Sequence, residues 1–298
     1  MLPVAVVEPS LEMEQRRIEQ ELDQILPAGD AYPSSIHRAM RYAVFAGGKR
    51  LRPILCIETG RLFGGADAAL LRVAAALELI HTYSLIHDDL PALDNDDLRR
   101  GKPTCHRTFG EATAILAGDA LLTLAFETLS APGLMPADRQ LRLIYDLGHG
   151  IGTRGGMVGG QVVDLETAGA PVDAVTLEYI HAAKTGSFLR AAVRAGALTG
   201  GASDEDLGRV TVYGEKVGLA FQIADDLLDV LGSTEALGKA VGKDHAQNKA
   251  TYPGLYGVEE SQRIALRLVN EAIAALVPYG DRGQQLKGIA QFLIARKS

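Results

Sequence analysis

Apolar positions recur with helical spacing along almost the whole chain. The first apolar stripe consists of Leu11, Ile18, Leu22, Ile25 and Leu26. Ser10 is a suitable N-cap before it and Pro27 a suitable stop after it. Six later stretches share a composition rich in Ala, Leu and Glu, which favours helix: 67–89, 111–130, 138–153, 173–200, 204–231 and 259–277. Because no alternating β-branched runs with hairpin turns occur, the pattern predicts an all-α fold.

Glycine pairs divide these stretches, and they are typical of short connections between helices. No linker, repeat or low-complexity segment separates two parts, so residues 1–298 are predicted to form a single domain. Residues 150–155 match the pattern G-x-G-x-x-G. That pattern indicates a dinucleotide site only after a strand, and both flanks here favour helix. A nicotinamide oxidoreductase is therefore a remote alternative.

The composition narrows the class of protein. The 298 residues are 47% hydrophobic and 22% charged with a net charge of -7, which argues against general nucleic-acid binding. The two cysteines cannot build a disulfide framework. The first residues lack a signal-peptide pattern, and charges such as Arg72 and Asp119 interrupt the long apolar stretches. We expect a cytoplasmic protein without stable membrane insertion.

A dense acidic motif follows the apolar helix predicted over 67–89. Asp88 and Asp89 lie at its end, and Asp94 follows six residues after Asp88. Pro91 cannot donate to a helical hydrogen bond, so the helix should end near it and Asp94 should return through an irregular extension. Adjacent carboxylates repel unless a cation compensates, and such oxygen ligands suit Mg²⁺ that shares its shell with substrate phosphates.

A second acidic motif lies in the stretch 204–231. Asp225 and Asp229 are four residues apart and project from one helix face, which Gln222 shares. Either motif alone is equally typical of a solvated or capping face. Two such motifs on separate apolar helices instead indicate a cage for several divalent metals and a highly charged anion.

Basic residues form a second group of candidate ligands. Gly48, Lys49 and Arg52 combine a glycine turn, a helix start and cationic side chains, which together bind phosphate. His81 lies seven residues before Asp88, about 10 Å along the same helix face. The alternatives are a solvated basic turn and a buried core histidine.

Three more basic segments follow along the chain. Arg99 and Arg100 point in different directions and could serve two phosphates, although their segment is also typical of a helix C-terminus. Lys184 and Thr185 lie in a helical stretch. Lys239 and Lys249 belong to a polar segment that could close over a diphosphate or simply be exposed.

In this order and spacing the motifs resemble those of the trans-prenyl diphosphate synthases, and most of all the bacterial farnesyl type. The segments that carry the resemblance are GGKRLRP, HTYSLIHDDLPALDNDDLRRGKPT, GGQVVDL, KTGSF, FQIADDLLD and GKDHAQNKATYP. The resemblance spans essentially the whole chain as one polyprenyl synthase domain. It implies the isoprenoid synthase fold, a helical bundle around a deep central cavity, and a homodimer. It also implies two to three Mg²⁺ ions, with Mn²⁺ as a substitute.

The resemblance also assigns roles residue by residue. The isopentenyl diphosphate site would contain Gly48, Lys49, Arg52, His81 and Arg100. The allylic diphosphate site would contain Arg99, Lys184, Thr185, Gln222, Lys239 and Lys249. The catalytic group would consist of Asp88, Asp89, Asp94, Asp225, Asp226, Asp229 and Lys184, with Asp88, Asp94 and Asp225 as the principal metal ligands.

The implied reaction is condensation of isopentenyl diphosphate with dimethylallyl and then geranyl diphosphate. Tyr83, about 7–8 Å below Asp88 along the helix, would with Ser84 set the floor of the tail cavity and a C15 product. A C20 synthase is the nearest alternative. A terpene cyclase is more distant, because the chain has no Trp and only 5% aromatic residues. A relative without catalytic activity would lack some of the motif aspartates or arginines, and in this sequence none is missing.

Overall fold

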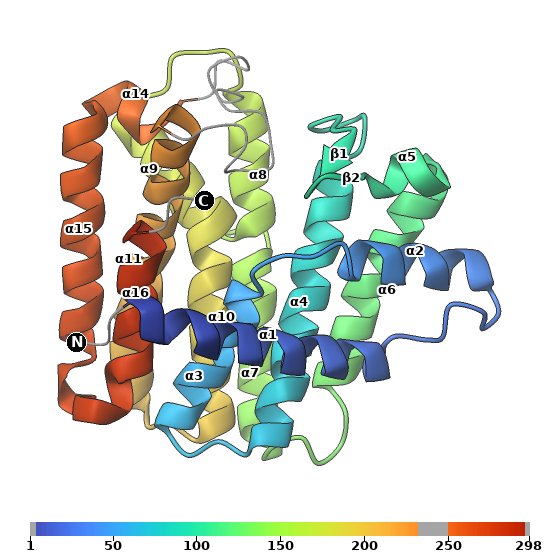
Figure 1. Ribbon diagram of the computed structural model, residues 1–298, viewed down its shortest axis with the longest axis horizontal. Helices are drawn as coiled ribbons and strands as arrows, with labels where there is room; N and C mark the ends of the chain where they lie inside the picture. Colours follow the sequence, from blue (N-terminus) through green and yellow to red (C-terminus); the bar gives the residue numbers. More distant parts are fainter. Residues whose placement is uncertain (1–3, 232–249, 296–298) are drawn as a thin grey trace.

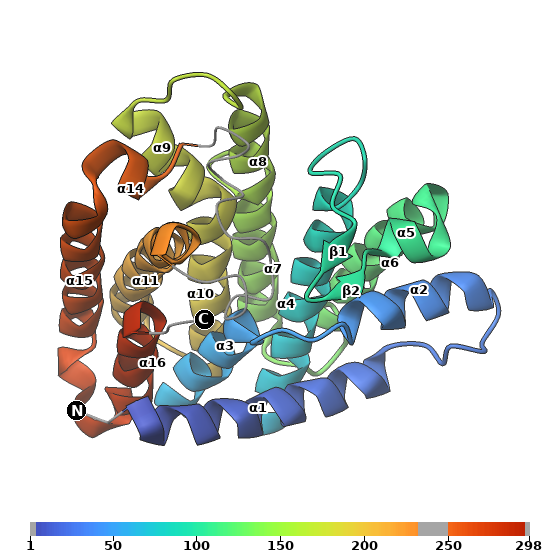
Figure 2. The same ribbon diagram turned by 45° about the horizontal axis from the view of Figure 1, so that its top comes forward.

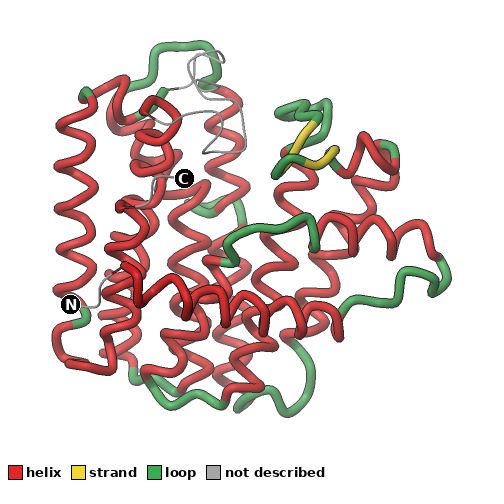
Figure 3. Tube along the Cα trace, in the orientation of Figure 1, coloured by secondary structure: helices red, strands yellow, loops and turns green. Residues whose placement is uncertain are grey.

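The computed structural model describes residues 4–231 and 250–295, and within these ranges the chain is helical almost throughout (Figure 1). The described strands are β1 (Leu98–Arg99) and β2 (Lys102–Pro103), which form one small antiparallel pair (Figure 3). The predicted all-α fold is therefore confirmed.

Four long helices form the centre of the bundle. They are α3 (Leu51–Leu62), α4 (Asp67–Asp88), α10 (Ser187–Gly200) and α11 (Asp204–Leu231). Helix α10 packs against α3, α11 and α7 (Ala137–Ile151). Helix α6 (Glu111–Leu129) packs against α4, and α15 (Val258–Ala275) packs against α11 on the opposite side of the molecule.

Shorter elements surround this centre. Helix α1 (Val4–Ile25) crosses the bundle and contacts α3, α4 and α16 (Gln284–Ala295) (Figure 2). The remaining described elements are α2 (Ser34–Val44), α5 (Cys105–Phe109), α8 (Met157–Glu166), α9 (Ala174–Ile180), the π-helix η1 (His181–Gly186), α14 (Tyr252–Tyr256) and the 3-10 helix η2 (Val277–Gly283).

Burial explains why the central helices pack on several sides. Leu70, Leu77 and Ile80 of α4 are fully buried, as is Phe188 of α10. A helix that is apolar all round belongs in a core. Gly196 of α10 lies directly against the backbone of α3, where any Cβ atom would collide with the Cys56 carbonyl oxygen. The two helices can therefore approach closely.

The first helix begins earlier than the N-cap signal predicts. Helix α1 runs through Ser10 from Val4, so the predicted N-cap is wrong. The Ser10 hydroxyl instead accepts a hydrogen bond from the Gln285 side chain at 2.6 Å. The later helices begin and end close to the predicted ranges. The G-x-G-x-x-G pattern lies at the end of α7 and in the turn before α8, so a helix and not a strand leads into it.

Two of the described helices, α4 and α6, are long and apolar enough to cross a membrane by length and composition alone. In α4, 67% of the apolar window is buried inside the bundle, as expected of a core helix. In α6 the buried share is 39%, which leaves an apolar face uncovered in the single chain.

Candidate active site

The first acidic motif lies where α4 ends. Asp88 is the last helical residue, and the chain then turns back so that the backbone N–H of Asp94 donates to the Asp88 carbonyl oxygen at 2.8 Å. The backbone N–H of Asp96 donates to the Asp89 carbonyl oxygen at 3.2 Å. This confirms the prediction that Asp94 returns toward Asp88 through an irregular extension.

The surroundings of Asp88 disfavour the ionised form of its carboxyl group. Its pKa is raised to about 6, chiefly by burial; the nearby Asp94 and Asp89 carboxylates add to the rise, and Lys184 and Arg99 oppose it. Burial and like charges both disfavour the ionised form. A cation bound beside Asp88 would favour its ionised form.

The hairpin of β1 and β2 directs Arg99 and Arg100 toward different partners. Arg100 and Gly101 have φ angles of 54° and 75°, as a type I′ turn requires. The alternative interpretation of this segment as a helix C-terminus is wrong. The Arg99 Nε donates to the Asp89 carboxylate at 2.9 Å, and its Nη2 contacts the same oxygen. The Arg100 guanidinium instead lies against Gly48, where a Cβ atom would collide with it.

The basic residues of 47–53 meet those of α4 beside this hairpin. The Arg52 Nη1 donates to the His81 Nε2 at 3.4 Å, and its guanidinium lies 5.1 Å from the centre of the buried Phe188 ring. Burial lowers the pKa of Arg52 to about 10, so it stays charged at neutral pH. Burial and the neighbouring arginines lower the pKa of His81 well below its usual value, so its imidazole is neutral.

Two donors of this cluster have no partner within the described part of the chain. They are the buried Arg52 Nε and the buried His81 Nδ1, which carries the ring proton because Nε2 accepts from Arg52. Buried donors without partners are costly, and an anionic ligand would satisfy them. The cluster Gly48, Arg52, His81 and Arg100 is thus brought together as predicted.

Sequence reasoning missed the carboxylate beneath this cluster. Glu78 of α4 is 1% exposed and accepts a hydrogen bond from the buried Arg50 Nη1 at 2.7 Å. Its negative charge favours the charged forms of both Arg52 and Arg100. The available signal was a lone glutamate inside an otherwise apolar helix, since such a residue needs a buried partner.

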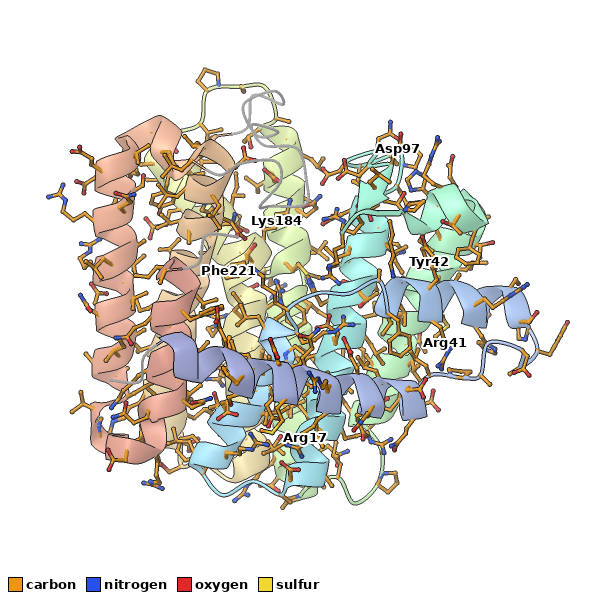
Figure 4. All side chains as sticks on the ribbon, in the orientation of Figure 1. Arg17, Arg41, Tyr42, Asp97, Lys184 and Phe221 are labelled. Carbon is orange, nitrogen blue, oxygen red and sulfur yellow. The ribbon has the colours of Figure 1, made fainter. Side chains whose placement is uncertain are left out.

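The π-helix η1 carries Lys184 and Thr185 between α8 and α11. The Lys184 ammonium donates to the Asp164 carboxylate at 2.7 Å. Burial lowers the pKa of Lys184, but the Asp164 and Asp88 carboxylates outweigh it and the net shift is upward. The Thr185 hydroxyl donates to the Gln222 side-chain oxygen at 2.9 Å. Lys184 is partly buried, and Figure 4 labels it over the upper part of the bundle, beside α8.

In the second acidic motif, Asp226 is held by buried hydrogen-bond partners. Asp226 is 3% exposed and accepts hydrogen bonds from His181, Gln222 and the backbone of Tyr252. Asp225, the preceding residue, lies close enough to Arg52 to favour its charged form. The second motif therefore faces the basic cluster through Asp225, and Asp229 is 5% exposed beside it. Lys239 and Lys249 lie outside the described residues.

A cavity of about 110 Å³ opens beside Lys184 and Gln222. Its lining includes Asp164, Thr185, His181 and Asp226. Within the described ranges no three carboxylate, imidazole or thiolate groups converge closely enough to hold an ion by themselves. The aspartates instead supply hard oxygen ligands in separate groups, which suits Mg²⁺ that completes its shell with water and substrate phosphate oxygens. The residues thus fit the ion that the sequence predicts.

The predicted floor residue is buried. Tyr83 is 8% exposed and packs edge-on against His87, with ring centroids 5.8 Å apart. His87 in turn lies directly against Gly118 of α6. The Ser84 hydroxyl donates to the His81 carbonyl oxygen at 2.8 Å, so it is turned toward its own helix.

Known proteins resemble this chain over nearly its whole length. The family model for polyprenyl synthetase matches residues 33–275. A dimethylallyltranstransferase from Fischerella ambigua is 48% identical over 96% of this chain and 82% of its own. A geranylgeranyl diphosphate synthase from Cyanophora paradoxa is 47% identical over 94% of this chain and 93% of its own. The crystal structure of an FPP/GFPP synthase from Zymomonas mobilis superposes with a TM-score of 0.88 at 40% identity, covering 98% of this chain and 100% of that one.

Proposed function

Since this chain belongs to the polyprenyl synthetase family, it is a short-chain trans-prenyltransferase, and we propose that its final product is farnesyl diphosphate. The substrates would be isopentenyl diphosphate and the allylic dimethylallyl and geranyl diphosphates. We place the reaction in the cytoplasm. The observation that carries the C15 product is the buried aromatic ring of Tyr83 on α4 below Asp88.

The two diphosphates would bind at the two groups of cations. The isopentenyl diphosphate would satisfy the unpartnered Arg52 Nε and His81 Nδ1 and contact Arg100, with Lys49 adding charge. The allylic diphosphate would take Lys184, Thr185, Gln222 and Arg99 as ligands. Asp88, Asp94 and Asp225 would hold Mg²⁺, which supplies Lewis-acid neutralisation of the departing diphosphate.

The chain's own residues would then control the chemistry. Lys184 would exchange its Asp164 partner for the allylic diphosphate and stabilise the negative charge that develops as the C–O bond breaks. The isopentenyl double bond attacks the allylic cation to form the new C–C bond, and the released diphosphate takes the proton lost from the product. The apolar core below Asp88 keeps water from the cation.

The role of Tyr83 is tested by shortening its side chain. Tyr83→Ala should move the main product from C15 to C20 or longer, because it removes the ring that would block the growing tail about 7–8 Å below Asp88. Dephosphorylated products are sized by chromatography, with Tyr42→Ala on α2 as a tyrosine control outside the proposed tail path. An unchanged C15 product from the folded Tyr83 variant would remove Tyr83 from the account.

A C20 product is the second candidate. The names of several relatives favour it, including the Cyanophora paradoxa protein and chloroplastic proteins of Arabidopsis thaliana, which are geranylgeranyl diphosphate synthases by name. Extension of a farnesyl primer by the wild-type enzyme would establish this alternative. The substrates, the binding groups and the mechanism would stay the same.

A further inference from the structure

Two side-chain hydrogen bonds join η1 to α11, and their residues are four positions apart on each element. The Thr185 hydroxyl donates to Gln222 at 2.9 Å, and four residues earlier on η1 the His181 Nε2 donates to Asp226 Oδ2 at 2.8 Å. The Gln222 amide also donates to Asp226 Oδ1 at 3.3 Å along α11. A carboxylate only accepts, so the imidazole is the donor of the second bond. The four side chains form one continuous chain of hydrogen bonds.

The Asp226 carboxylate also joins a third element. The backbone N–H of Tyr252, at the start of α14, donates to the same Oδ2 atom at 2.9 Å. The Tyr252 ring lies 5.3 Å from the His181 ring at a tilt of 35°. His181, Asp226 and Tyr252 are each 3–6% exposed. Elements η1, α11 and α14 therefore converge on one buried carboxylate.

Glycine contacts fix the separation of η1 from its neighbours but not its orientation. A Cβ atom on Gly218 of α11 would lie 2.7 Å from the Gly186 Cα, and one on Gly160 of α8 would collide with the Lys184 backbone. Because these contacts involve backbone atoms without interlocking side chains, they would allow η1 to slide or rotate against α8 and α11. A π-helix is uncommon and persists only where its surroundings hold it, so directional bonds are needed to fix the orientation.

From this network we infer that His181 and Asp226 are positioning residues for the allylic diphosphate site. They fix η1 relative to α11, so that Lys184 and Thr185 on one element and Gln222 and Asp225 on the other form a single binding surface. Asp225 and Asp226 are consecutive on α11 and point about 100° apart. One carboxylate of the pair thus faces the substrate and the other anchors the π-helix.

This inference rests on the proposed function for the identity of the ligand, but it can be tested without turnover. The full chain with Mg²⁺ is titrated by calorimetry with geranyl thiolodiphosphate, an allylic analogue that ionises poorly, and separately with isopentenyl diphosphate. His181→Asn removes the donor at the Nε2 position, because its amide is too short to reach Asp226. His181→Gln can restore a donor there.

The expected result is selective. His181→Asn should weaken binding of the allylic analogue at least about tenfold, because small misplacements of several ligands add together. Its Kd for isopentenyl diphosphate should stay within about twofold, and His181→Gln should recover most of the loss. Tyr213→Phe is the matched control: it deletes a buried 2.8 Å hydrogen bond from α11 to the Leu286 carbonyl oxygen of α16, away from the site. It should lower the melting temperature without changing either Kd.

Three results would overturn the inference: an unchanged Kd for the allylic analogue in His181→Asn, an equal loss for both ligands, or no recovery in His181→Gln. If His181→Asn does not fold, Asp226→Asn is tested in its place. The asparagine side chain carries an NH₂ group where the carboxylate has an acceptor oxygen, so it disrupts the hydrogen bonds that Asp226 accepts. The same selective loss is expected. Binding without any turnover by the wild-type chain would contradict the proposed function alone.

Discussion

Asp88 shows how a single residue links stability to function. Its pKa is raised to about 6 chiefly by burial, with the nearby aspartates adding to the effect. A group whose pKa in the folded state exceeds its unfolded value stabilises the fold below the unfolded pKa, and that contribution is lost as the pH rises through the folded value. The ionised Asp88 therefore destabilises the substrate-free protein above about pH 6.

Asp88→Asn should make the substrate-free protein more stable at pH 7.5 while reducing turnover by orders of magnitude. Because Asp88 is partly exposed, we expect the gain in the free energy of unfolding to be on the order of 1 kcal/mol. This corresponds to about 2 °C in melting temperature. The gain should disappear by about pH 4, where the wild-type carboxyl is protonated. Calorimetric melting at both pH values checks this.

Asp97→Asn, an exposed residue of the same loop that pairs with Arg107, is the control and should show no such gain. A melting temperature at pH 7.5 that is equal to or below wild type in Asp88→Asn would contradict the electrostatic account. Near-wild-type turnover in saturating Mg²⁺ would contradict its role as a metal ligand.

At the scale of the element, the β-hairpin determines how two adjacent arginines are used. The turn at Arg100 and Gly101 sends Arg99 to the Asp89 carboxylate and Arg100 to Gly48. The hairpin thus connects the aspartate motif with the basic cluster that we propose binds isopentenyl diphosphate.

Exchanging each arginine for alanine should separate the two substrates. Arg100→Ala should raise the KM for isopentenyl diphosphate by about tenfold to a hundredfold, since a charge-assisted bond to phosphate contributes about 1.5–3 kcal/mol. Arg99→Ala should act mainly on the allylic substrate. Steady-state kinetics with each substrate varied checks both, and Arg107→Ala is an exposed control. An unchanged KM for isopentenyl diphosphate in Arg100→Ala would contradict the assignment.

The elements differ in how far the sequence could predict them. Helix α4 and the return of Asp94 were predictable because apolar periodicity and Pro91 both act locally. The π-helix was not, since residues 181–186 favour ordinary helix and their widened turn depends on contacts with distant residues such as Gly218. The Arg50–Glu78 pair was also missed, because its two residues lie 28 positions apart.

At the scale of the whole molecule, the packed helices α6 and α7 both carry exposed apolar side chains. Ile115 and Leu116 of α6 are 43% and 58% exposed, and Leu141 and Tyr145 of the neighbouring α7 are 70% and 71% exposed. Exposed apolar side chains that gather on one face of a chain are typical of an interface. We therefore propose that α6 and α7 form the homodimer contact that the family resemblance implies.

Leu116→Glu should convert the dimer to a monomer, because it buries a charge at the centre of an apolar contact. Sedimentation velocity at several protein concentrations measures the change. Leu266→Glu on α15, exposed at 52% on the opposite side of the bundle, is the matched control and should remain dimeric (Figure 1). A wild-type chain that sediments as a monomer would contradict the placement.

The product of the wild-type enzyme tests the central claim most directly. The chain is incubated with Mg²⁺, radiolabelled isopentenyl diphosphate and, in separate reactions, dimethylallyl, geranyl or farnesyl diphosphate, and the dephosphorylated products are sized. The account predicts C15 from the first two primers and no extension of the third. A C20 product would contradict the role of Tyr83 as the cavity floor, and no incorporation with any primer would contradict the proposed prenyltransferase site as a whole.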